Sequence, residues 1–134
     1  MYPQAKLVSV LNGLILDVIV DIRKDSPTFG EHVSVILEAF DGKTVFIPEG
    51  YAHGFKTLSD GNNVVSYKTT NIYYPNDAYI IAWNDLDIGI DWLFTIEELQ
   101  QCTKDFDINK IIKISDQDKN ARRLNEIDKN ICRL

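Results

Sequence analysis

Short β-rich runs, each broken by turn residues, dominate the chain from residue 6 to residue 92. The run at 14–21 places apolar residues at every second position, the period of a half-buried strand, although Ile15 and Ile19 make the alternation imperfect. Further strands are expected, with Gly, Pro, Asn and Asp punctuation between them, at 7–10, 33–37, 44–47, 54–58, 64–69 and 78–83. There is no βαβ rhythm and no glycine-rich phosphate loop. Six or seven strands at this spacing predict an all-β antiparallel sandwich or barrel.

The last third of the sequence predicts short helices. Thr95 and Glu98 have the spacing of a capping box, in which each side chain satisfies a free amide at a helix start, and this helix is expected to run to about Cys102. The tail that follows has one narrow apolar face, made by Ala121, Leu124, Ile127 and Ile131. We expect one domain over residues 1–134, with a helical extension at 93–134.

Charge and length exclude several classes of function. The 134 residues suffice for a real core. The net charge of −6 leaves no excess of Lys and Arg to neutralise phosphates, which argues against nucleic acid or an anionic membrane as a partner. No secretory leader and no apolar stretch of membrane-spanning length is found, so we expect a cytoplasmic protein. The two cysteines form no CxxC pair and are expected to be free thiols.

Several local strings occur in one order at compact spacing. They are AKLV at 5–8, LDVIVDIR at 16–23, SPTFG at 26–30, IPEGYAHGF at 47–55, YKTTN at 67–71, WND at 83–85 and IGIDW at 88–92. Together they make the chain resemble the dTDP-4-dehydrorhamnose 3,5-epimerase family. The resemblance extends from Lys6 to about Leu124.

The resemblance implies a cupin-like double-stranded β-helix, a jelly-roll barrel, that assembles as a homodimer. It implies an isomerase that inverts the two carbons flanking the C4 ketone of dTDP-4-keto-6-deoxyglucose, on the route to dTDP-L-rhamnose, with no metal or redox cofactor. The C4 carbonyl acidifies the hydrogens at C3 and C5, so a base can remove one of them if the enolate oxygen is stabilised. Reprotonation from the other face completes each inversion.

Three residues match the family's catalytic positions. Lys6 matches the lysine that faces the developing enolate, and Tyr67 matches the tyrosine that delivers a proton to the opposite face of the sugar. By residue type alone, a strand lysine is usually solvated and a barrel tyrosine is usually a core residue. Asp118, in ISDQDK at 114–119, matches the aspartate that orients the catalytic histidine, with Asp105 as a rival placement.

Three further residues match positions that line the substrate pocket. His53 matches a pocket histidine, and Asp17 an inward-facing aspartate that would be costly to bury without a hydrogen bond. Tyr73 matches the aromatic residue that stacks on the thymine ring. Taken singly, such a histidine or tyrosine is more often structural. His32 has no partner motif and is assigned no role, and the HxH pattern of metal-binding cupins is absent from the sequence.

The match departs from the family at one point. The family's general base is the histidine of an ArgGlyLeuHis string shortly before the AKLV motif, whereas Met1 lies five residues before Lys6. We therefore expect an N-terminally truncated product or a gene read from an internal methionine, nearly inactive as an isolated chain. A dTDP-sugar-binding protein without turnover, an epimerase acting at C3 alone and a GDP-heptose epimerase stay open as alternatives. A metal-dependent cupin oxygenase is the weakest reading.

Overall fold

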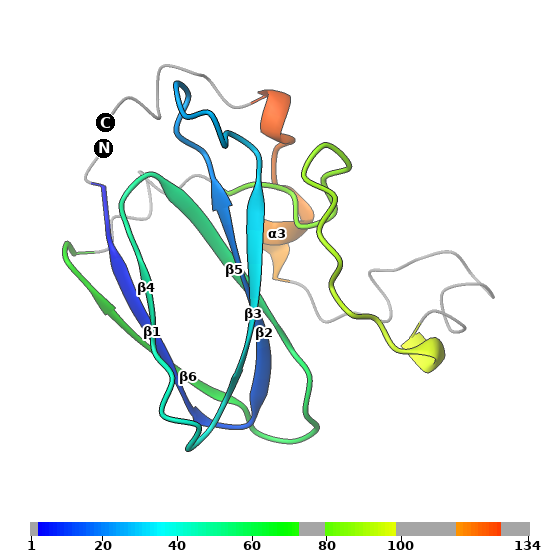
Figure 1. Ribbon diagram of the computed structural model, residues 1–134. Helices are drawn as coiled ribbons and strands as arrows, with labels where there is room; N and C mark the ends of the chain where they lie inside the picture. The colour runs from blue at the N-terminus through cyan, green and yellow to red at the C-terminus, as the bar shows by residue number, and fades with distance from the viewer. Residues whose placement is uncertain (1–2, 73–79, 99–114, 127–134) are drawn as a thin grey trace.

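The computed structural model describes residues 3–72, 80–98 and 115–126, and these form two facing three-stranded sheets (Figure 1). Sheet A has the order β4-β1-β6 and sheet B the order β3-β2-β5, and every pairing is antiparallel. The strands are β1 (Lys6–Asn12), β2 (Leu14–Asp21), β3 (His32–Glu38), β4 (Val45–Ile47), β5 (Tyr51–Thr57) and β6 (Val64–Thr69). These six confirm six of the predicted strands and the all-β class, with ends that differ by a few residues.

The seventh predicted strand, at 78–83, is wrong over the residues that the structure describes, 80–83. Ile81 forms an isolated bridge with Arg122, and the amide of Ala82 donates to the carbonyl of Arg122 over 2.8 Å. This stretch packs over sheet B, with Ala82 buried, and does not join a sheet edge. Its apolar residues therefore signal burial and not strand pairing.

The core explains why the alternation along β2 is imperfect. One face of β2 presents Ile15 to the space between the sheets, where it packs with Val8 and Val10 of β1. The other face presents Leu16, Val18 and Val20, which are covered by Ile88 and Leu124. A central strand that is buried on both faces becomes a nearly continuous apolar run.

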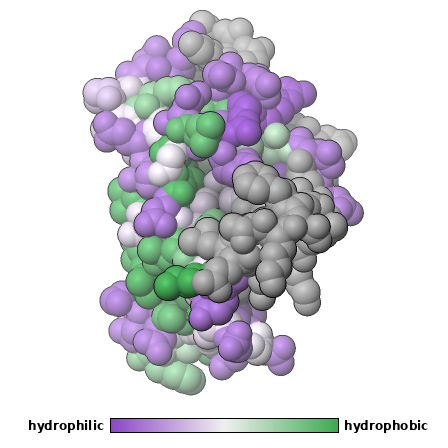
Figure 2. Space-filling view, turned by 90° about the vertical axis from the view of Figure 1, so that its right-hand side faces the viewer, coloured by the Kyte–Doolittle hydropathy of each residue, from purple (hydrophilic) through white to green (hydrophobic). Residues whose placement is uncertain are grey.

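Residues 80–98 and the C-terminal helical turns make up the layer that covers the outer face of sheet B (Figure 1). Figure 2 looks onto this side of the molecule. Apolar side chains reach the surface along its left-hand margin, between polar regions above and below. None of the helices in the described residues is long and apolar enough to cross a lipid bilayer.

A glycine corner joins the two sheets. Gly13 links β1 to β2 with a φ of 90°, in the left-handed region that favours glycine. The next amide, that of Leu14, donates to Ser59 Oγ over 3.0 Å and to Asn63 Oδ1 over 3.1 Å. A Cβ atom on Gly13 would lie 2.0 Å from Asn63 Oδ1, so this corner has no room for a side chain.

The C-terminal residues form short helical turns, as predicted. The capping box is confirmed, because the amide of Thr95 donates to Glu98 Oε2 over 2.7 Å and the amide of Glu98 donates to Thr95 Oγ1 over 3.2 Å. Residues 96–98 are helical, and the expected end near Cys102 lies outside the described residues. The helix α3 (Asp116–Lys119) and the 3-10 turn η2 (Leu124–Glu126) follow.

The apolar positions predicted for this tail do not form one helical face over residues 115–126. The bridge from Arg122 to Ile81 interrupts the helical turns, and Leu124 then inserts into the outer cluster of sheet B. The amide of Leu124 donates to the buried carboxylate of Asp85 over 2.7 Å, which anchors this turn. Ile127 and Ile131 lie outside the described residues, and the division into one domain with an extension at 93–134 stays a prediction.

Candidate functional site between the sheets

Four of the predicted site residues face the space between the two sheets. Successive side chains of a strand point to opposite faces, so Lys6 shares the inward face of β1 with the buried Val8. Tyr67 of β6 is the register partner of Val8 and faces the same way. From sheet B, the inward face of β2 presents Asp17 and that of β5 presents His53.

The floor of this site is a hydrogen-bonded pair. Nε2 of His53 is hydrogen-bonded to Oδ1 of Asp17, and the two side chains are 4% and 0% exposed. An ionised carboxylate can only accept hydrogen bonds, so Nε2 carries the proton. Oδ2 of Asp17 has no hydrogen-bond partner among the described residues. A buried charge is costly unless it is paired, and His53 supplies the pairing.

Tyr67 brings a phenol from sheet A to this pair. Its ring lies edge-on to the imidazole of His53, with 5.9 Å between the ring centroids and an interplanar angle of 81°. The residue is 46% exposed, so the ring is half covered while a path to solvent remains. Burial, and then the negative charge of Asp17, raise the pKa of Tyr67 above its ordinary value of 10.0. The phenol is therefore kept protonated, as a proton donor must be.

Lys6 is the cation of the site. Burial lowers the pKa of its ammonium from the ordinary 10.5, and the charge of Asp17 opposes that decrease. A half-buried ammonium is poorly screened by water, so it acts strongly on a charge that develops beside it.

Phe55 belongs to the same site and escaped the sequence analysis. It lies two residues after His53 on β5, hence on the same face, and its ring centroid is 6.4 Å from that of Tyr67. It is the register partner of Asp17, yet 38% of its surface is exposed. The two-residue spacing in HisGlyPhe was the signal that could have found it.

The remaining predicted residues are not joined to this site by the structure. Asp118 is exposed in α3, where its carboxylate accepts a hydrogen bond from Ser115 Oγ over 2.6 Å and its amide donates back to that oxygen over 3.2 Å. Tyr73 and Asp105 lie outside the described residues. The roles of all three stay predictions.

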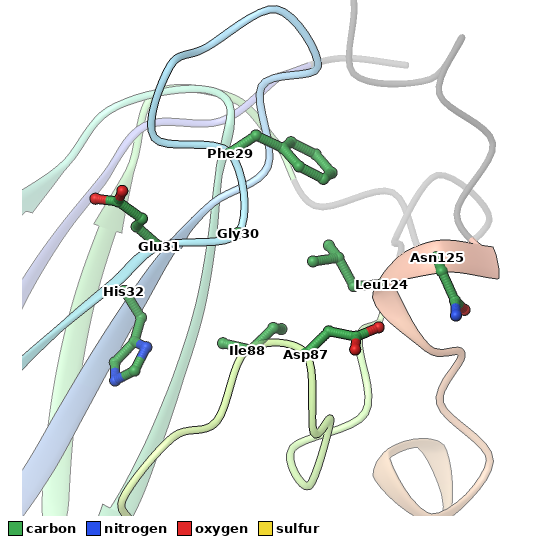
Figure 3. A pocket seen from close by; sticks show the side chains of 8 residues that line it. All are labelled: Phe29, Gly30, Glu31, His32, Asp87, Ile88, Leu124 and Asn125. Carbon is green, nitrogen blue, oxygen red and sulfur yellow. The ribbon is translucent and has the colours of Figure 1, made fainter.

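A cavity lies on the outer side of sheet B and contains none of the predicted site residues (Figure 3). This cavity of about 720 Å³ is lined by Phe29, Gly30, Glu31, His32, Asp87, Ile88, Leu124 and Asn125. The register partner of His32 is Val20, whose side chain faces away from sheet A, so His32 lies across the sheet from His53. Two of its lining residues, Glu31 and Asp87, are acidic, which disfavours an anionic ligand.

Metal coordination has no candidate in the part of the chain that the structure describes. Among these residues, no three His, Cys, Asp or Glu side chains gather in a way that could hold a metal ion. The chemical groups that converge between the sheets are instead a cation, a phenol and an imidazole paired with a carboxylate, a set suited to moving protons.

Comparison with known proteins agrees with this chemistry. The family model described as dTDP-4-dehydrorhamnose 3,5-epimerase matches residues 1–126. A relative of that name from Methanothermobacter thermautotrophicus is 49% identical over 104 residues, which is 77% of this chain and 56% of the relative. The one from Salmonella typhimurium is 51% identical over 92 residues, 69% of this chain and 50% of the relative. The chain thus spans about half the length of these relatives.

Solved structures give the same result. The dTDP-6-deoxy-D-glucose-3,5-epimerase from Legionella pneumophila, in complex with dTDP-4-keto-L-rhamnose, matches with a TM-score of 0.80 and 38% identity, over 96% of this chain and 60% of that one. A 3'-monoepimerase from Streptomyces bikiniensis, in complex with dTDP-quinovose, matches with a TM-score of 0.73 and 31% identity, over 92% and 55%. These matches confirm the cupin-like jelly roll. The chain belongs to the dTDP-4-dehydrorhamnose 3,5-epimerase family.

Proposed function

We propose that this chain carries the sugar site of an isomerase that inverts C3 and C5 of dTDP-4-keto-6-deoxyglucose and yields dTDP-4-keto-L-rhamnose. The observation that supports it most is the convergence of Lys6, Tyr67 and the His53–Asp17 pair in one space between the sheets. These groups come from four strands and both sheets, and together they suit proton transfer beside a ketone.

Each group has a role in the proposed reaction. The C4 carbonyl oxygen gains negative charge when the family's catalytic histidine, or another base in its place, takes a proton from C3 or C5, and the ammonium of Lys6 stabilises that charge. Tyr67 returns a proton to the opposite face of the ring, which its raised pKa favours because the phenol is protonated at neutral pH. His53 contacts the sugar, and Asp17 lines the same pocket.

The relatives support the choice of substrate. The Legionella structure holds dTDP-4-keto-L-rhamnose and the Streptomyces monoepimerase holds dTDP-quinovose. Both ligands combine a thymidine diphosphate with a 6-deoxy sugar, so we extend that ligand class to this chain. We also propose that Tyr73 stacks on the thymine ring and that Asp118 orients a catalytic histidine, as the family resemblance implies.

Hydrogen exchange tests the proposed reaction directly. The purified chain is incubated with dTDP-4-keto-6-deoxyglucose in D₂O, and deuterium at C3 and C5 is located by NMR and mass spectrometry. We expect the isolated chain to incorporate deuterium at both carbons only slowly, and we expect Tyr67→Phe and Lys6→Met to lower the incorporation further. An Asp60→Asn variant, changed in an exposed loop, serves as the matched control that leaves exchange intact.

Other outcomes would replace the proposal by a defined alternative. Deuterium at C3 without C5 would favour a monoepimerase like the Streptomyces relative. Retained binding of dTDP without exchange at either carbon would favour a protein that binds the nucleotide sugar without turning it over. Absence of both binding and exchange would contradict the substrate class itself.

We further propose that the chain forms a homodimer through the outer face of sheet A. Leu7 and Phe46 are register partners on this face, with 37% and 62% of their surface exposed, and Leu11 of the same strand is 59% exposed. Light scattering coupled to size-exclusion chromatography should report twice the chain mass. Phe46→Lys should give a monomer, whereas Phe40→Lys, a change at a 97% exposed loop phenylalanine, should not. A monomeric wild-type chain would contradict this proposal.

A further inference from the structure

The proposed reaction uses the tyrosine of the YKTTN motif and assigns no role to the three polar residues that end it, Thr69, Thr70 and Asn71. β6 ends at Thr69, which is the register partner of Lys6, the first residue of β1. Thr70 and Asn71 therefore run alongside the segment that leads into Lys6. The pairing of β1 with β4 also stops at Lys6, so this segment continues the sheet on the β6 side.

Thr70 extends the pairing of the two chains one residue past Lys6. Its amide donates to the carbonyl of Ala5 over 3.1 Å, and its Oγ1 accepts a hydrogen bond from the amide of Ala5 over 3.0 Å. In a regular antiparallel pair, the backbone carbonyl of Thr70 would accept from that amide. The hydroxyl replaces the carbonyl, so the two chains stay hydrogen-bonded where the regular ladder ends.

Gln4 and Asn71 extend the pairing further through their side-chain amides. Nδ2 of Asn71 donates to the carbonyl of Pro3 over 2.6 Å, and Nε2 of Gln4 donates to the carbonyls of Asn71 and Ile72, each over 2.8 Å. Proline has no amide hydrogen to give to a ladder, so the side-chain amides supply the donors here. Gln4, Thr70 and Asn71 together form what we call the terminal clamp.

The terminal clamp matters for Lys6 because strand ends open most easily. The end of a chain segment frays unless it is tied down, and Lys6 is the first residue of β1. The direction of its backbone decides whether the side chain points between the sheets or away from them. Burial lowers the pKa of Lys6, which places the ammonium at least partly out of water. A frayed strand end would lose that burial.

We propose that the terminal clamp positions Lys6: it holds the start of β1 against β6, so that the ammonium stays between the sheets. The same register sets the spacing between Lys6 and Tyr67, which face the same side of sheet A. The three clamp residues are thus positioning residues that act through the lysine. This inference rests on the proposed function for its effect on catalysis, whereas its structural content can be measured on the ligand-free chain.

A clamp that only stabilises the strand end is the alternative, and the other end of β1 supplies a matched control. There Nδ2 of Asn12 donates to the carbonyl of Asn62, so Asn12→Ala removes the same kind of bond at the far end of the strand from Lys6. The alternative predicts that Asn12→Ala and Asn71→Ala affect the site alike. The positioning role predicts an effect of Asn71→Ala alone.

NMR of the ligand-free chain shows first whether the clamp has opened. The amides of Ala5 and Thr70 are hydrogen-bonded across it. In Asn71→Ala we expect both amides to exchange with solvent about 3–10-fold faster than in wild type, because a single hydrogen bond contributes modestly to such an opening. The amides of β2 should exchange as in wild type.

The ionisation of Lys6 then reports where its ammonium lies. Lysines methylated with ¹³C-formaldehyde keep their charge, and Lys6→Arg identifies the Lys6 signal by its loss. The titratable groups that face Lys6 are Asp17, His53 and Tyr67, and every clamp variant retains them. Burial lowers the pKa of Lys6 more than Asp17 raises it, so an ammonium released into water should titrate closer to 10.5.

The clamp variants should differ from their controls in this titration. We expect the Lys6 midpoint to rise toward 10.5 in Asn71→Ala and in Thr70→Val, which removes the hydroxyl while keeping the shape of the side chain. Thr70→Ser keeps the hydroxyl and should restore the wild-type midpoint. Asn12→Ala should leave the midpoint where it is.

Deuterium incorporation into dTDP-4-keto-6-deoxyglucose measures the consequence for catalysis. At saturating substrate the rate should fall by up to about 10²-fold in Asn71→Ala and Thr70→Val, because a misplaced group loses much of its effect on the transition state. The half-saturating concentration should stay nearly constant, since Lys6 acts on charge that develops during the reaction. Thr70→Ser and Asn12→Ala should keep the wild-type rate.

Two results would overturn the inference. One is an unchanged Lys6 midpoint in Asn71→Ala although the amides of Ala5 and Thr70 exchange faster, and the other is an equal rise of the midpoint in Asn12→Ala. Gln4→Ala applies the same test from the opposite chain if Thr70→Val does not fold. Absence of deuterium incorporation in wild type, with the Lys6 midpoint rising as expected, would contradict the proposed function and leave the role of the clamp intact.

Discussion

The ring of Tyr67 stands edge-on to the imidazole of His53, 5.9 Å away between centroids, although the two residues belong to opposite sheets. This contact spans the space between the sheets. The site therefore depends on the separation of sheets A and B, which the packing of Val8, Ile15 and neighbouring core residues sets. Changes to the chemistry of the site and changes to the corners between the sheets should have distinct effects.

Replacing the phenol of Tyr67 should separate catalysis from packing. Tyr67→Phe keeps the ring against His53 and removes the transferable proton, so exchange should fall by about 10²–10⁴ while the thermal midpoint of unfolding stays nearly unchanged. Deuterium incorporation and calorimetry measure the two effects. Tyr51→Phe, at the inward-facing end of β5, is the control that should retain exchange. Equal loss of exchange in both variants would argue against a special role for Tyr67.

The loss of activity at alkaline pH should reflect deprotonation of the Lys6 ammonium. Burial lowers the pKa of Lys6 from 10.5, so the ammonium loses its proton at a pH below 10.5, whereas burial raises the pKa of Tyr67 above 10.0. The exchange rate should therefore decline at a pH below 10.5. Lys6→Arg, whose guanidinium stays charged, should move that decline to higher pH, and Lys6→Met should lower the rate at every pH. If Lys6→Arg left the alkaline decline at the same pH, the decline would have to arise from another group.

Asp21 should govern stability in acid. Its side chain is 4% exposed and accepts hydrogen bonds from Arg23 at 2.6 and 2.9 Å, and from Ser26 and Thr28 at 2.6 Å each, which hold the pKa of the carboxyl far below its usual 3.8. Asp21→Asn should lower the free energy of unfolding at neutral pH by about 1–3 kcal/mol.

The pH dependence of this effect has a definite sign. Because the folded pKa is depressed, the stabilisation is complete above about pH 3.8 and is lost as the pH falls from there toward the folded pKa. Urea unfolding at pH 7 and at pH 2 to 3 should show the wild type and Asp21→Asn converging in acid. A constant difference in unfolding free energy across this range would contradict the prediction.

Gly13 should be required both for its backbone conformation and for space. Gly13→Ala places a Cβ against Asn63 Oδ1 in a left-handed conformation, whereas Gly42→Ala meets the same kind of φ, 73°, with no heavy atom within 4 Å. The left-handed conformation costs a non-glycine residue about 1–3 kcal/mol. Denaturant unfolding should show the Gly13 variant to be less stable than the Gly42 variant. The difference between their unfolding free energies measures the steric crowding of the added Cβ atom against Asn63. Equal losses of stability in the two variants would show that the left-handed conformation accounts for the whole effect.

The sequence by itself determined the strands and the chemical identity of the site. Local alternation located six strands, the capping box at Thr95 and Glu98 was read correctly, and the order of the motifs pointed to the family. These signals are local, because a strand period and a helix cap depend on residues a few positions apart.

Only the tertiary structure decided which segments cover the sheets and which side chains come into contact. The sequence could not distinguish the apolar run at 80–83 from a strand, since its burial comes from packing on sheet B and from Arg122, far along the chain. Nor could it show that Nε2 of His53 is hydrogen-bonded to Asp17, that the other oxygen of Asp17 has no partner among the residues described, or that Phe55 completes the site. Each of these depends on the register between β2 and β5 and on the gap between the sheets, which the chain fixes by packing distant residues together.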